Sequence, residues 1–253
     1  MYRFEFEKQT YPSLADQVGT FIQKRMVDEY NLKIKKVPFK EDLTEPETHC
    51  RAPIFISPDW SRNTKRALVL IQGMGEVRAG LWARKASINH SLEIGSMLPQ
   101  IKFAVENDMA ILILNPNFER NHNGNPVDSL VSTKETHWNY VFKKFVKNRT
   151  IAEEIFIIAH SYGGRCCAGL ISKFTDEFHD RVKAIAFTDS SSCKVDTVDK
   201  EEEEWINNHC KAYVASDKAL GKKEKSKIFR SNTISFIHIL SKDLIHIHIS
   251  QII

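Results

Sequence analysis

The sequence predicts an α/β fold, a three-layer sandwich with a mostly parallel sheet and antiparallel strands at its N-terminal edge. Four continuous apolar runs predict strands that are buried on both faces, as the central strands of a parallel sheet are. These runs span residues 66–72, 109–115, 154–160 and 183–189. Helix-like segments lie between them, and this alternation indicates right-handed crossovers in a doubly wound sheet.

The N-terminal segments show different patterns. Apolar residues recur at helical spacing over residues 13–30, which predicts an amphipathic helix. Residues 32–39 alternate between polar and apolar side chains, and residues 53–57 form a short apolar run, so both segments predict strands. These two strands would form the antiparallel edge of the sheet, and the polar, proline-bearing stretch between them predicts a loop.

Helices are expected after the edge strands wherever apolar residues return to helical spacing. The segments with this pattern are residues 96–107, 134–147, 163–175 and 201–210. The last of them, EEEEWINNHC, contains His209.

The C-terminal stretch differs from the rest of the chain. Residues 231–253 alternate isoleucine and histidine, and an edge strand, a disordered tail and the product of truncation or alternative splicing are all compatible with this pattern. We therefore expect one α/β domain over residues 1–215 and a basic, atypical tail over residues 216–253.

Composition limits the class of protein. The 253 residues are 42% hydrophobic, with ten glycines and eight prolines, which indicates an ordered globular core. The first ten residues contain no apolar run typical of a signal peptide, and no window reaches the roughly 18 apolar residues of a membrane span. Five cysteines, an odd number, do not suggest a disulfide framework. We expect a protein of the nucleus or the cytoplasm, without a membrane partner.

Ser161 stands between an apolar run and a helix-like segment, in the sequence AHSYGG. A nucleophile elbow needs small residues on both sides of its serine because the tight strand-to-helix turn brings backbones together. Ala159 and Gly163 occupy these two positions, and Gly164 is interpreted as allowing close packing of the helix on a strand. The pattern predicts an elbow on an α/β-hydrolase-like sheet.

A catalytic serine also needs oxyanion donors, a base and an acid. The backbone N–H of Tyr162 is one candidate donor, and the loop 72–80 offers a second because Gly73 and Gly75 allow its N–H groups to turn inward. Asp189 ends an apolar run at the same predicted edge of the sheet. It is interpreted either as the acid or as a capping residue.

The base is the missing part of this constellation. His160 neighbours Ser161 along a strand, where successive side chains point to opposite faces. The downstream histidines are His209, His238, His246 and His248. None of them stands on a loop after a recognisable core strand, so the base stays unassigned. His246 and His248 would share one face of a strand, but no ligand set accompanies them, and no metal or cofactor is expected.

Three segments resemble one family: residues 67–117, 155–164 and 184–190. The family is that of Argonaute-binding cotranscriptional regulators, which share the domain of an Argonaute small-interfering-RNA chaperone subunit. Within a resemblance covering residues 10–215, the most specific parts are VRAGLWAR at 77–84 and LNPN at 114–117. The resemblance implies an α/β-hydrolase-like domain in a nuclear protein with Argonaute and chromatin factors as partners.

The resemblance also implies a role in RNA silencing, heterochromatin formation or alternative splicing. Members of the family carry a further histidine after a Thr-Asp-Arg step, where this chain has GKKEKSKIFRSNTIS at 221–235. We therefore expect a non-enzymatic Argonaute-associated factor. A serine hydrolase acting on an ester or acyl substrate through Ser161, and a truncated chain without a function of its own, are the alternatives.

Two groups of residues are candidate partner surfaces. Arg78, Trp82 and Arg84 are interpreted either as a partner or phosphate surface or as a loop–helix packing set. Residues 211–230 carry seven basic and two acidic side chains, a local net charge of +5 in a chain of net charge +4. This run is interpreted as a weak, sequence-independent RNA contact, a nuclear import signal or a solvated connector. Its candidate contact residues are Lys222, Lys223, Lys225 and Lys227.

Overall fold

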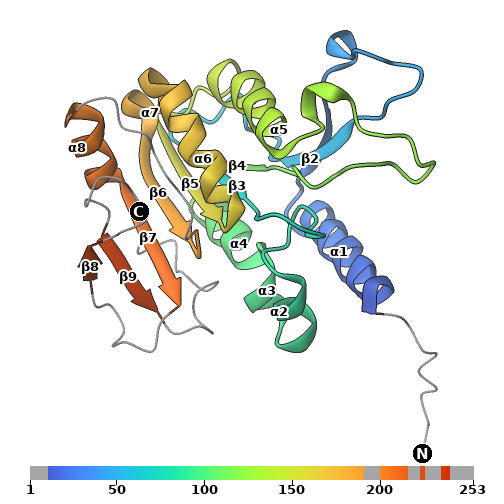
Figure 1. The fold of residues 1–253 in the computed structure, drawn as a ribbon, viewed down its shortest axis with the longest axis horizontal. Helices are drawn as coiled ribbons and strands as arrows, with labels where there is room; N and C mark the ends of the chain where they lie inside the picture. The colour runs from blue at the N-terminus through green and yellow to red at the C-terminus, as the bar shows by residue number, and fades with distance from the viewer. Residues whose placement is uncertain (1–10, 191–199, 216–222, 226–234, 240–253) are drawn as a thin grey trace, which may run out of the picture.

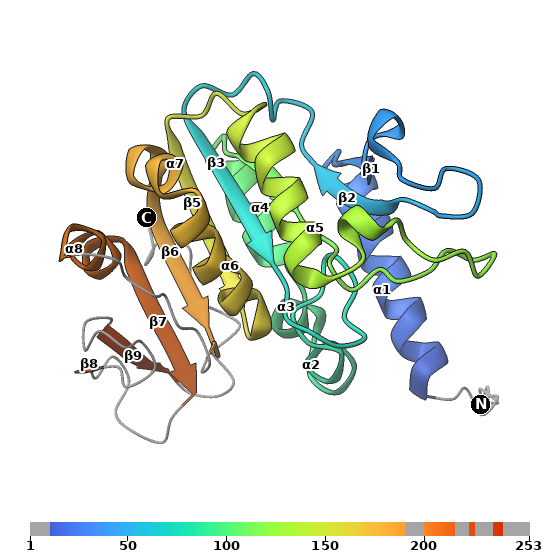
Figure 2. The same ribbon diagram turned by 45° about the horizontal axis from the view of Figure 1, so that its top comes forward.

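The structure is a computed structural model that describes residues 11–190, 200–215, 223–225 and 235–239. A twisted sheet runs through its centre, and helices cover both faces of the sheet (Figures 1 and 2). The predicted three-layer α/β architecture is therefore confirmed.

The described residues form a nine-stranded sheet in the order β1-β2-β4-β3-β5-β6-β7-β9-β8. Its strands are β1 (Lys33–Val37), β2 (Ala52–Ile56), β3 (Arg66–Ile71), β4 (Ala110–Ile113), β5 (Glu154–His160), β6 (Val182–Thr188), β7 (Cys210–Ala215), β8 (Lys223–Lys225) and β9 (Ser235–Ile239). The strands from β4 to β9 pair in parallel, whereas β1 and β2 form the antiparallel N-terminal edge, as predicted. At the other edge, β8 pairs antiparallel to β9.

Two groups of helices sandwich the sheet (Figure 2). One face is covered by α1 (Tyr11–Asp28), α2 (Arg84–Asn89), α3 (Leu92–Gly95) and α4 (Leu98–Glu106). The other face is covered by α5 (Lys134–Val141), α6 (Tyr162–Lys173), α7 (Thr175–Arg181) and α8 (Lys200–His209). Short helical turns occur at η1 (Lys40–Asp42) and η2 (Ser129–Val131), and α5 continues as a π-helix, η3 (Phe142–Lys147).

The two faces of the sheet carry separate apolar cores. In β3, Val69 packs into the core under α5 to α8, whereas Leu68 and Leu70 pack into the core under α1 and α4. Strands buried on both sides have no polar face, because every second residue points to each core. This is why the central strands read as continuous apolar runs in the sequence.

Several elements differ from the sequence-based expectations. The helix expected over 134–147 is α5 followed by a π-helical turn, and the short helices α2, α3 and α7 were not expected. Strand β7 was also missed. Strand β9 lies inside the atypical C-terminal stretch and pairs with β7, while the domain boundary at residue 215 stays a prediction.

Among the helices that the structure describes, none combines the length and the apolar character that crossing a membrane requires.

Candidate functional site

The structure places Ser161 on the turn between β5 and α6. Its backbone angles are φ 52° and ψ −124°, a combination that side chains other than glycine rarely adopt. The Ser161 N–H donates to the Thr188 carbonyl at 2.8 Å, and the Gly164 N–H donates to the Ser161 carbonyl at 3.0 Å. These bonds fix the turn at the carboxyl end of the parallel strands, where α/β folds hold their ligand sites.

Two glycines allow the turn to pack against its neighbours. A Cβ atom at Gly163 would lie 2.6 Å from the Gln72 carbonyl oxygen and 2.8 Å from the Ile71 carbonyl oxygen. A Cβ atom at Gly73 would lie 2.9 Å from the Cβ of Ser161. Helix α6 therefore approaches strand β3 closely at Gly163, the residue next to Gly164, whose predicted packing role stays a prediction.

The loop facing Ser161 is held by asparagine side chains. Asn117 donates from Nδ2 to the carbonyl oxygens of Gly73, at 2.8 Å, and of Val77, at 2.9 Å. Asn115 accepts from the Ala79 N–H at 3.1 Å. Both asparagines belong to the LNPN segment at the end of β4. The two segments on which the family resemblance is most specific, 77–84 and 114–117, therefore form one hydrogen-bonded unit.

A buried histidine supports this unit from behind. The Asn115 N–H donates to His137 Nε2 at 3.2 Å, and His137 is completely buried. Burial lowers the pKa of His137 to about 3, so its ring is neutral at physiological pH. Because Nε2 accepts, the proton lies on Nδ1, which has no hydrogen-bond partner among the described residues.

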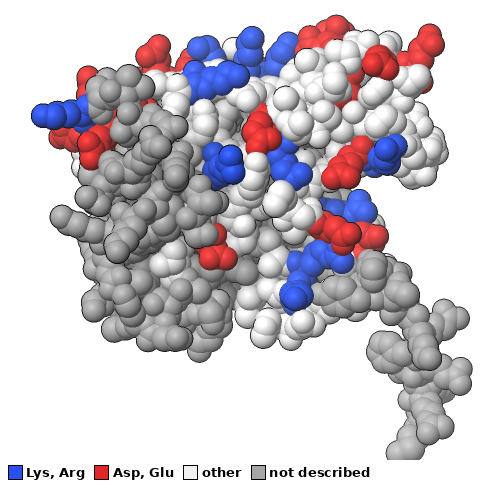
Figure 3. Space-filling model, in the orientation of Figure 1, with Lys and Arg blue, Asp and Glu red and all other residues white. Residues whose placement is uncertain are grey.

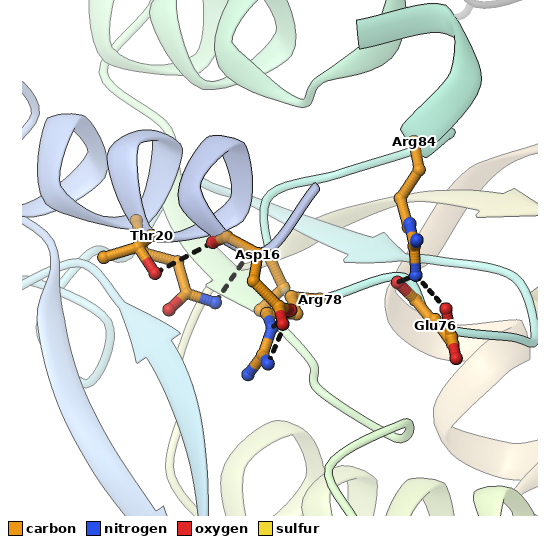
Figure 4. Close-up of polar contacts among 7 residues, drawn as sticks. Asp16, Thr20, Glu76, Arg78 and Arg84 are labelled. Atoms are coloured by element: carbon orange, nitrogen blue, oxygen red, sulfur yellow. Dashed lines mark hydrogen bonds and ion pairs between the residues drawn. The ribbon is translucent and has the colours of Figure 1, made fainter. Parts of the chain in front are cut away.

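Helix α1 clamps the loop from the other side (Figure 4). Gln23 donates from Nε2 to the Ala79 carbonyl at 3.1 Å, and Arg78 forms an ion pair with Asp16 at 2.8 Å. Gly80, at φ +94°, brings the backbone so close to α1 that a Cβ atom would lie 2.5 Å from the sulfur of Met26.

Arg78, Trp82 and Arg84, predicted as a possible partner surface, do not lie on one common surface in the structure. Arg78 pairs with Asp16 and Arg84 pairs with Glu76, so both guanidinium groups lie beside the loop (Figure 4). Trp82 is only 4% exposed, and its Nε1 donates to Gln100 at 3.1 Å. Assigning Trp82 to a surface was therefore wrong, because its ring completes the core under α4.

A hollow of about 550 Å³ opens beside the loop. Its charged lining residues are Asp16, Glu76, Arg78, Arg84, Glu119, Arg120 and Lys134. Gly75 also contributes to the lining, whereas Ser161 does not. The hollow therefore presents charges of both signs next to the elbow and leaves the serine outside its wall.

The polar residues nearest to Ser161 do not complete a triad. His160 Nδ1 lies 3.0 Å from Thr188 Oγ1, and its ring packs edge-on against Trp82. Burial lowers the pKa of His160, and the charge of nearby Asp189 opposes this shift. Asp189 is exposed, and its backbone N–H donates to the Tyr213 carbonyl at 2.9 Å. Among the described side chains, none forms a hydrogen bond with Ser161 Oγ.

The downstream histidines remain outside the site as far as the structure describes them. His209 ends α8 directly before β7, so it lies at the amino edge of the parallel strands, opposite to Ser161. Its Nδ1 is 2.8 Å from the Trp205 carbonyl oxygen, and its ring stacks on that indole. Of His238 only the backbone, in β9, is described, and His246 and His248 lie outside the described residues.

Three other side chains near the elbow, those of Tyr162, Cys166 and Cys167, are hydrogen-bonded or buried in the core. The Tyr162 hydroxyl donates to Glu135, which joins the first turns of α6 and α5. Burial raises the pKa of the Cys166 thiol to about 12, and Cys167 is fully buried, which favours packing over reactivity for this pair. Within the described part of the chain, no group of three or more His, Cys, Asp or Glu side chains could hold a metal ion.

The basic run at 211–230 is described only in part. Lys223 and Lys225 belong to β8, of which the backbone alone is described, and Lys222 and Lys227 lie outside the described residues. On the face shown in Figure 3, the described basic side chains lie along the upper rim and at scattered positions across the middle and lower right, most of them near acidic ones. The described residues on that face form no broad surface patch of a single charge.

Comparison with known proteins identifies what the chain is similar to. The family model described as "Arb2 domain" matches residues 2–120 and 120–220. The "Cotranscriptional regulator ARB2A homolog" of Dictyostelium discoideum is 33% identical over 221 residues, which cover 74% of this chain and 55% of that protein. The human "Cotranscriptional regulator ARB2A" is 26% identical, and the match covers 85% of this chain and 63% of that protein. This chain thus spans less than two thirds of the length of these relatives.

One solved structure shares the fold over nearly the whole chain. It is a histone deacetylase structure from Saccharomyces cerevisiae, with a TM-score of 0.58 at 14% identity. The match covers 97% of this chain and 95% of that one. At this level of identity the likeness concerns the fold alone.

Proposed function

Since this chain belongs to the Arb2 domain family, we propose that it is a non-enzymatic, Argonaute-associated nuclear factor. Its process would be small-RNA-mediated silencing, heterochromatin formation or cotranscriptional regulation of splicing. The names of the curated relatives support a regulatory role in general. The link to Argonaute, to chromatin factors and to the nucleus rests on the family resemblance.

The observation that carries the non-enzymatic part is an elbow beside which no described side chain is placed as a base. Ser161 has the strained turn of a nucleophile, with the Tyr162 N–H and the loop at Gly73 beside it. A serine hydroxyl attacks a carbonyl only when a neighbouring base takes its proton. The adjacent imidazole, His160, instead faces Thr188, and the acid candidate Asp189 lies near that imidazole. In this arrangement both groups support the turn.

The surface that we propose for a protein partner is the hollow beside the loop. Arg78 and Arg84 both line it, and each forms an ion pair with an acidic residue of the same chain. The Arg78–Asp16 pair is exposed, where such pairs contribute little to stability, so Arg78 can exchange Asp16 for a carboxylate of a partner at small cost. Arg84 is mostly buried and holds the exposed Glu76 at the wall of the hollow. Because the walls are fixed by Asn115 and Asn117, the hollow keeps its shape while partners change.

Labelling with a fluorophosphonate probe tests the absence of catalysis. We expect slow labelling of the purified protein that is the same in wild type and in Ser161→Ala. Rapid labelling that disappears with this substitution would establish the second candidate function, a serine hydrolase acting on an ester or acyl substrate. The elbow geometry of Ser161 is the observation that favours this candidate.

Co-immunoprecipitation with Argonaute tests the proposed partner. We expect the wild-type chain to be recovered with Argonaute and the double variant Arg78→Gln/Arg84→Gln to be depleted. The control removes two exposed arginines away from the hollow, Arg62→Gln/Arg149→Gln, and should be recovered like the wild type. No recovery of the folded wild-type chain, or equal recovery of both double variants, would contradict the proposal.

A further inference from the structure

A second hollow, of about 710 Å³, lies beside the antiparallel edge of the sheet. One wall comes from the chain between β1 and β2, and the other from the segment that follows β4 (Figure 1). Phe118 lines this hollow and also the hollow beside the glycine loop. The two therefore adjoin at one side chain.

The walls of this second hollow are tied together by hydrogen bonds. Asp128 Oδ2 accepts from the Thr44 N–H at 2.8 Å and from the Thr44 hydroxyl at 2.9 Å. The Cys50 N–H donates to the Pro126 carbonyl at 2.8 Å, and the Asp128 N–H donates to the Cys50 carbonyl at 2.9 Å. Asp128 is completely buried, so these bonds are shielded from water. The hollow is thus formed before any ligand arrives.

The charged lining of this hollow is entirely basic. Lys36, Lys40 and Arg51 contribute to it, and no aspartate or glutamate does. None of the three forms an ion pair with another described residue. Glu45 lies 3.2 Å from His49, which also lines the hollow. Three basic side chains on one lining, none of them in an ion pair with a described carboxylate, create a local excess of positive charge suited to an anion.

Apolar side chains make up part of the remaining lining. Phe118 offers an aromatic ring, and Leu43, Pro46 and Pro53 provide further apolar surface. Asn121 adds an amide that can both donate and accept hydrogen bonds. A volume of about 710 Å³ falls within the range typical of small-molecule sites. His49, His122 and Cys50 also line the hollow, but together they do not have the geometry of a metal site.

We propose that this hollow binds a small phosphate monoester that also carries a flat ring, that is, a nucleoside monophosphate. The phosphate lies between Lys36, Lys40 and Arg51, where charge-assisted hydrogen bonds replace its hydration shell. The base lies on Phe118, since any of the nucleobases can stack on an aromatic ring. This binding does not depend on Ser161 or on an Argonaute partner, and so goes beyond the function proposed above.

Isothermal titration calorimetry with adenosine 5′-monophosphate tests this proposal on the full chain. We expect saturable binding at one site, and a loss of affinity of roughly tenfold or more in the variant Lys36→Gln/Lys40→Gln/Arg51→Gln. The matched control, Lys33→Gln/Lys35→Gln/Lys143→Gln, makes the same change in net charge at exposed lysines outside the hollow. Its affinity should equal that of the wild type. Thermal unfolding of each variant shows that all are folded.

Three further ligands separate the parts of the site. Adenosine lacks the phosphate, and ribose 5-phosphate and inorganic phosphate lack the ring, so each should bind at least about tenfold more weakly than adenosine 5′-monophosphate. Equal binding of adenosine and of its monophosphate would overturn the role of the cations. An equal loss of affinity in the two triple variants would mean that the net charge of the protein, and not the lining of the hollow, accounts for binding. Binding of an acidic phosphopeptide without binding of the nucleotide would show that the hollow is a peptide site instead.

Discussion

The serine turn and the loop that faces it meet at one edge of the sheet but are held in place by different forces. At the turn, backbone atoms pack so closely that Gly163 and Gly73 leave no room for a side chain. In the loop beyond Gly73, amide side chains such as Asn117 hydrogen-bond to backbone carbonyl oxygens and tie the loop to the segment after β4. Close backbone packing and backbone hydrogen bonds thus fix the turn, whereas side-chain hydrogen bonds fix much of the loop.

This difference explains how the elbow keeps its geometry although the described residues around it do not complete a catalytic triad. Nothing that holds the turn involves the hydroxyl of Ser161, because the bonds at this residue are made by its backbone N–H and carbonyl. The geometry of the turn is therefore independent of catalysis. The side chains of Asn115 and Asn117 instead fix the loop, so the shape of the loop surface depends on them directly.

The largest expected effect tests steric exclusion at the turn. In Gly163→Ala, the new methyl group would meet two backbone carbonyl oxygens of β3 and the residue after it, neither of which can move easily. We expect a loss of about 3 kcal/mol in the free energy of unfolding, measured by urea denaturation. Gly169→Ala on the same helix is the control, since nothing lies within 4 Å of its added Cβ. That variant should be unchanged or more stable by about 0.5–1 kcal/mol.

The second effect tests the buried support of the loop by its response to pH. His137 has a pKa of about 3 in the folded chain and about 6.5 when unfolded, so the unfolded state binds more protons between these values. The contribution of His137 to the free energy of unfolding is present above pH 6.5 and is lost as the pH falls below it. At full effect the loss is about 1.4 kcal/mol per pH unit. Between pH 6.5 and 4.5 the loss from this residue is about 2 kcal/mol.

His137→Gln isolates this contribution, because its side-chain oxygen can still accept from the Asn115 N–H but does not titrate. Denaturation across this pH range should show a shallower slope for the variant than for the wild type. Parallel slopes would mean that the His137 ring is accessible to protons in the folded state.

The third effect tests the polar network itself. Asn117→Ala removes the donor from two loop carbonyls, at Gly73 and Val77, and we expect a loss of about 1–2 kcal/mol. Amide hydrogen exchange should accelerate over residues 73–79 and stay unchanged in α6. Asn139→Ala is the control, because Asn139 donates only to a carbonyl of its own helix. An equal loss of stability in both variants would remove the special role of the loop asparagine.

The smallest effect measures the strain at the turn. Ser161→Gly relieves the positive φ, whereas Ser161→Ala retains it, so the glycine variant should be the more stable of the two. The greater freedom of glycine in the unfolded chain offsets part of this gain and leaves about 1 kcal/mol. Thermal unfolding of the pair provides the measurement. A more stable alanine variant would show that the turn stores no strain at Ser161.

The sequence predicted strands β1 to β6 because their signals are local. A strand buried on both faces needs an unbroken apolar run, and a turn of this kind needs small residues, and both are visible in a few consecutive positions. The short helices α2 and α3 were missed because four to six residues are too few for a periodicity to appear.

The loop network could not be predicted because it joins distant positions. Nothing near Asn117 in the sequence indicates that its side chain reaches Gly73, 44 residues earlier. Trp82 was grouped with two arginines by proximity along the chain, but its partner Gln100 lies 18 residues away and draws it into the core. A base for Ser161 is a long-range feature of the same kind, and the sequence alone left it unassigned.

The clamp of α1 on the loop has a consequence for the order of folding. The loop is complete only when three segments meet: helix α1, the end of β4 and helix α5. Gln23 and Ala79 are 56 residues apart, and closing such a long stretch of chain delays the contacts that depend on it. We therefore expect the hollow beside the loop to be among the last parts to form and, in native-state exchange, to open together with the last turns of α1.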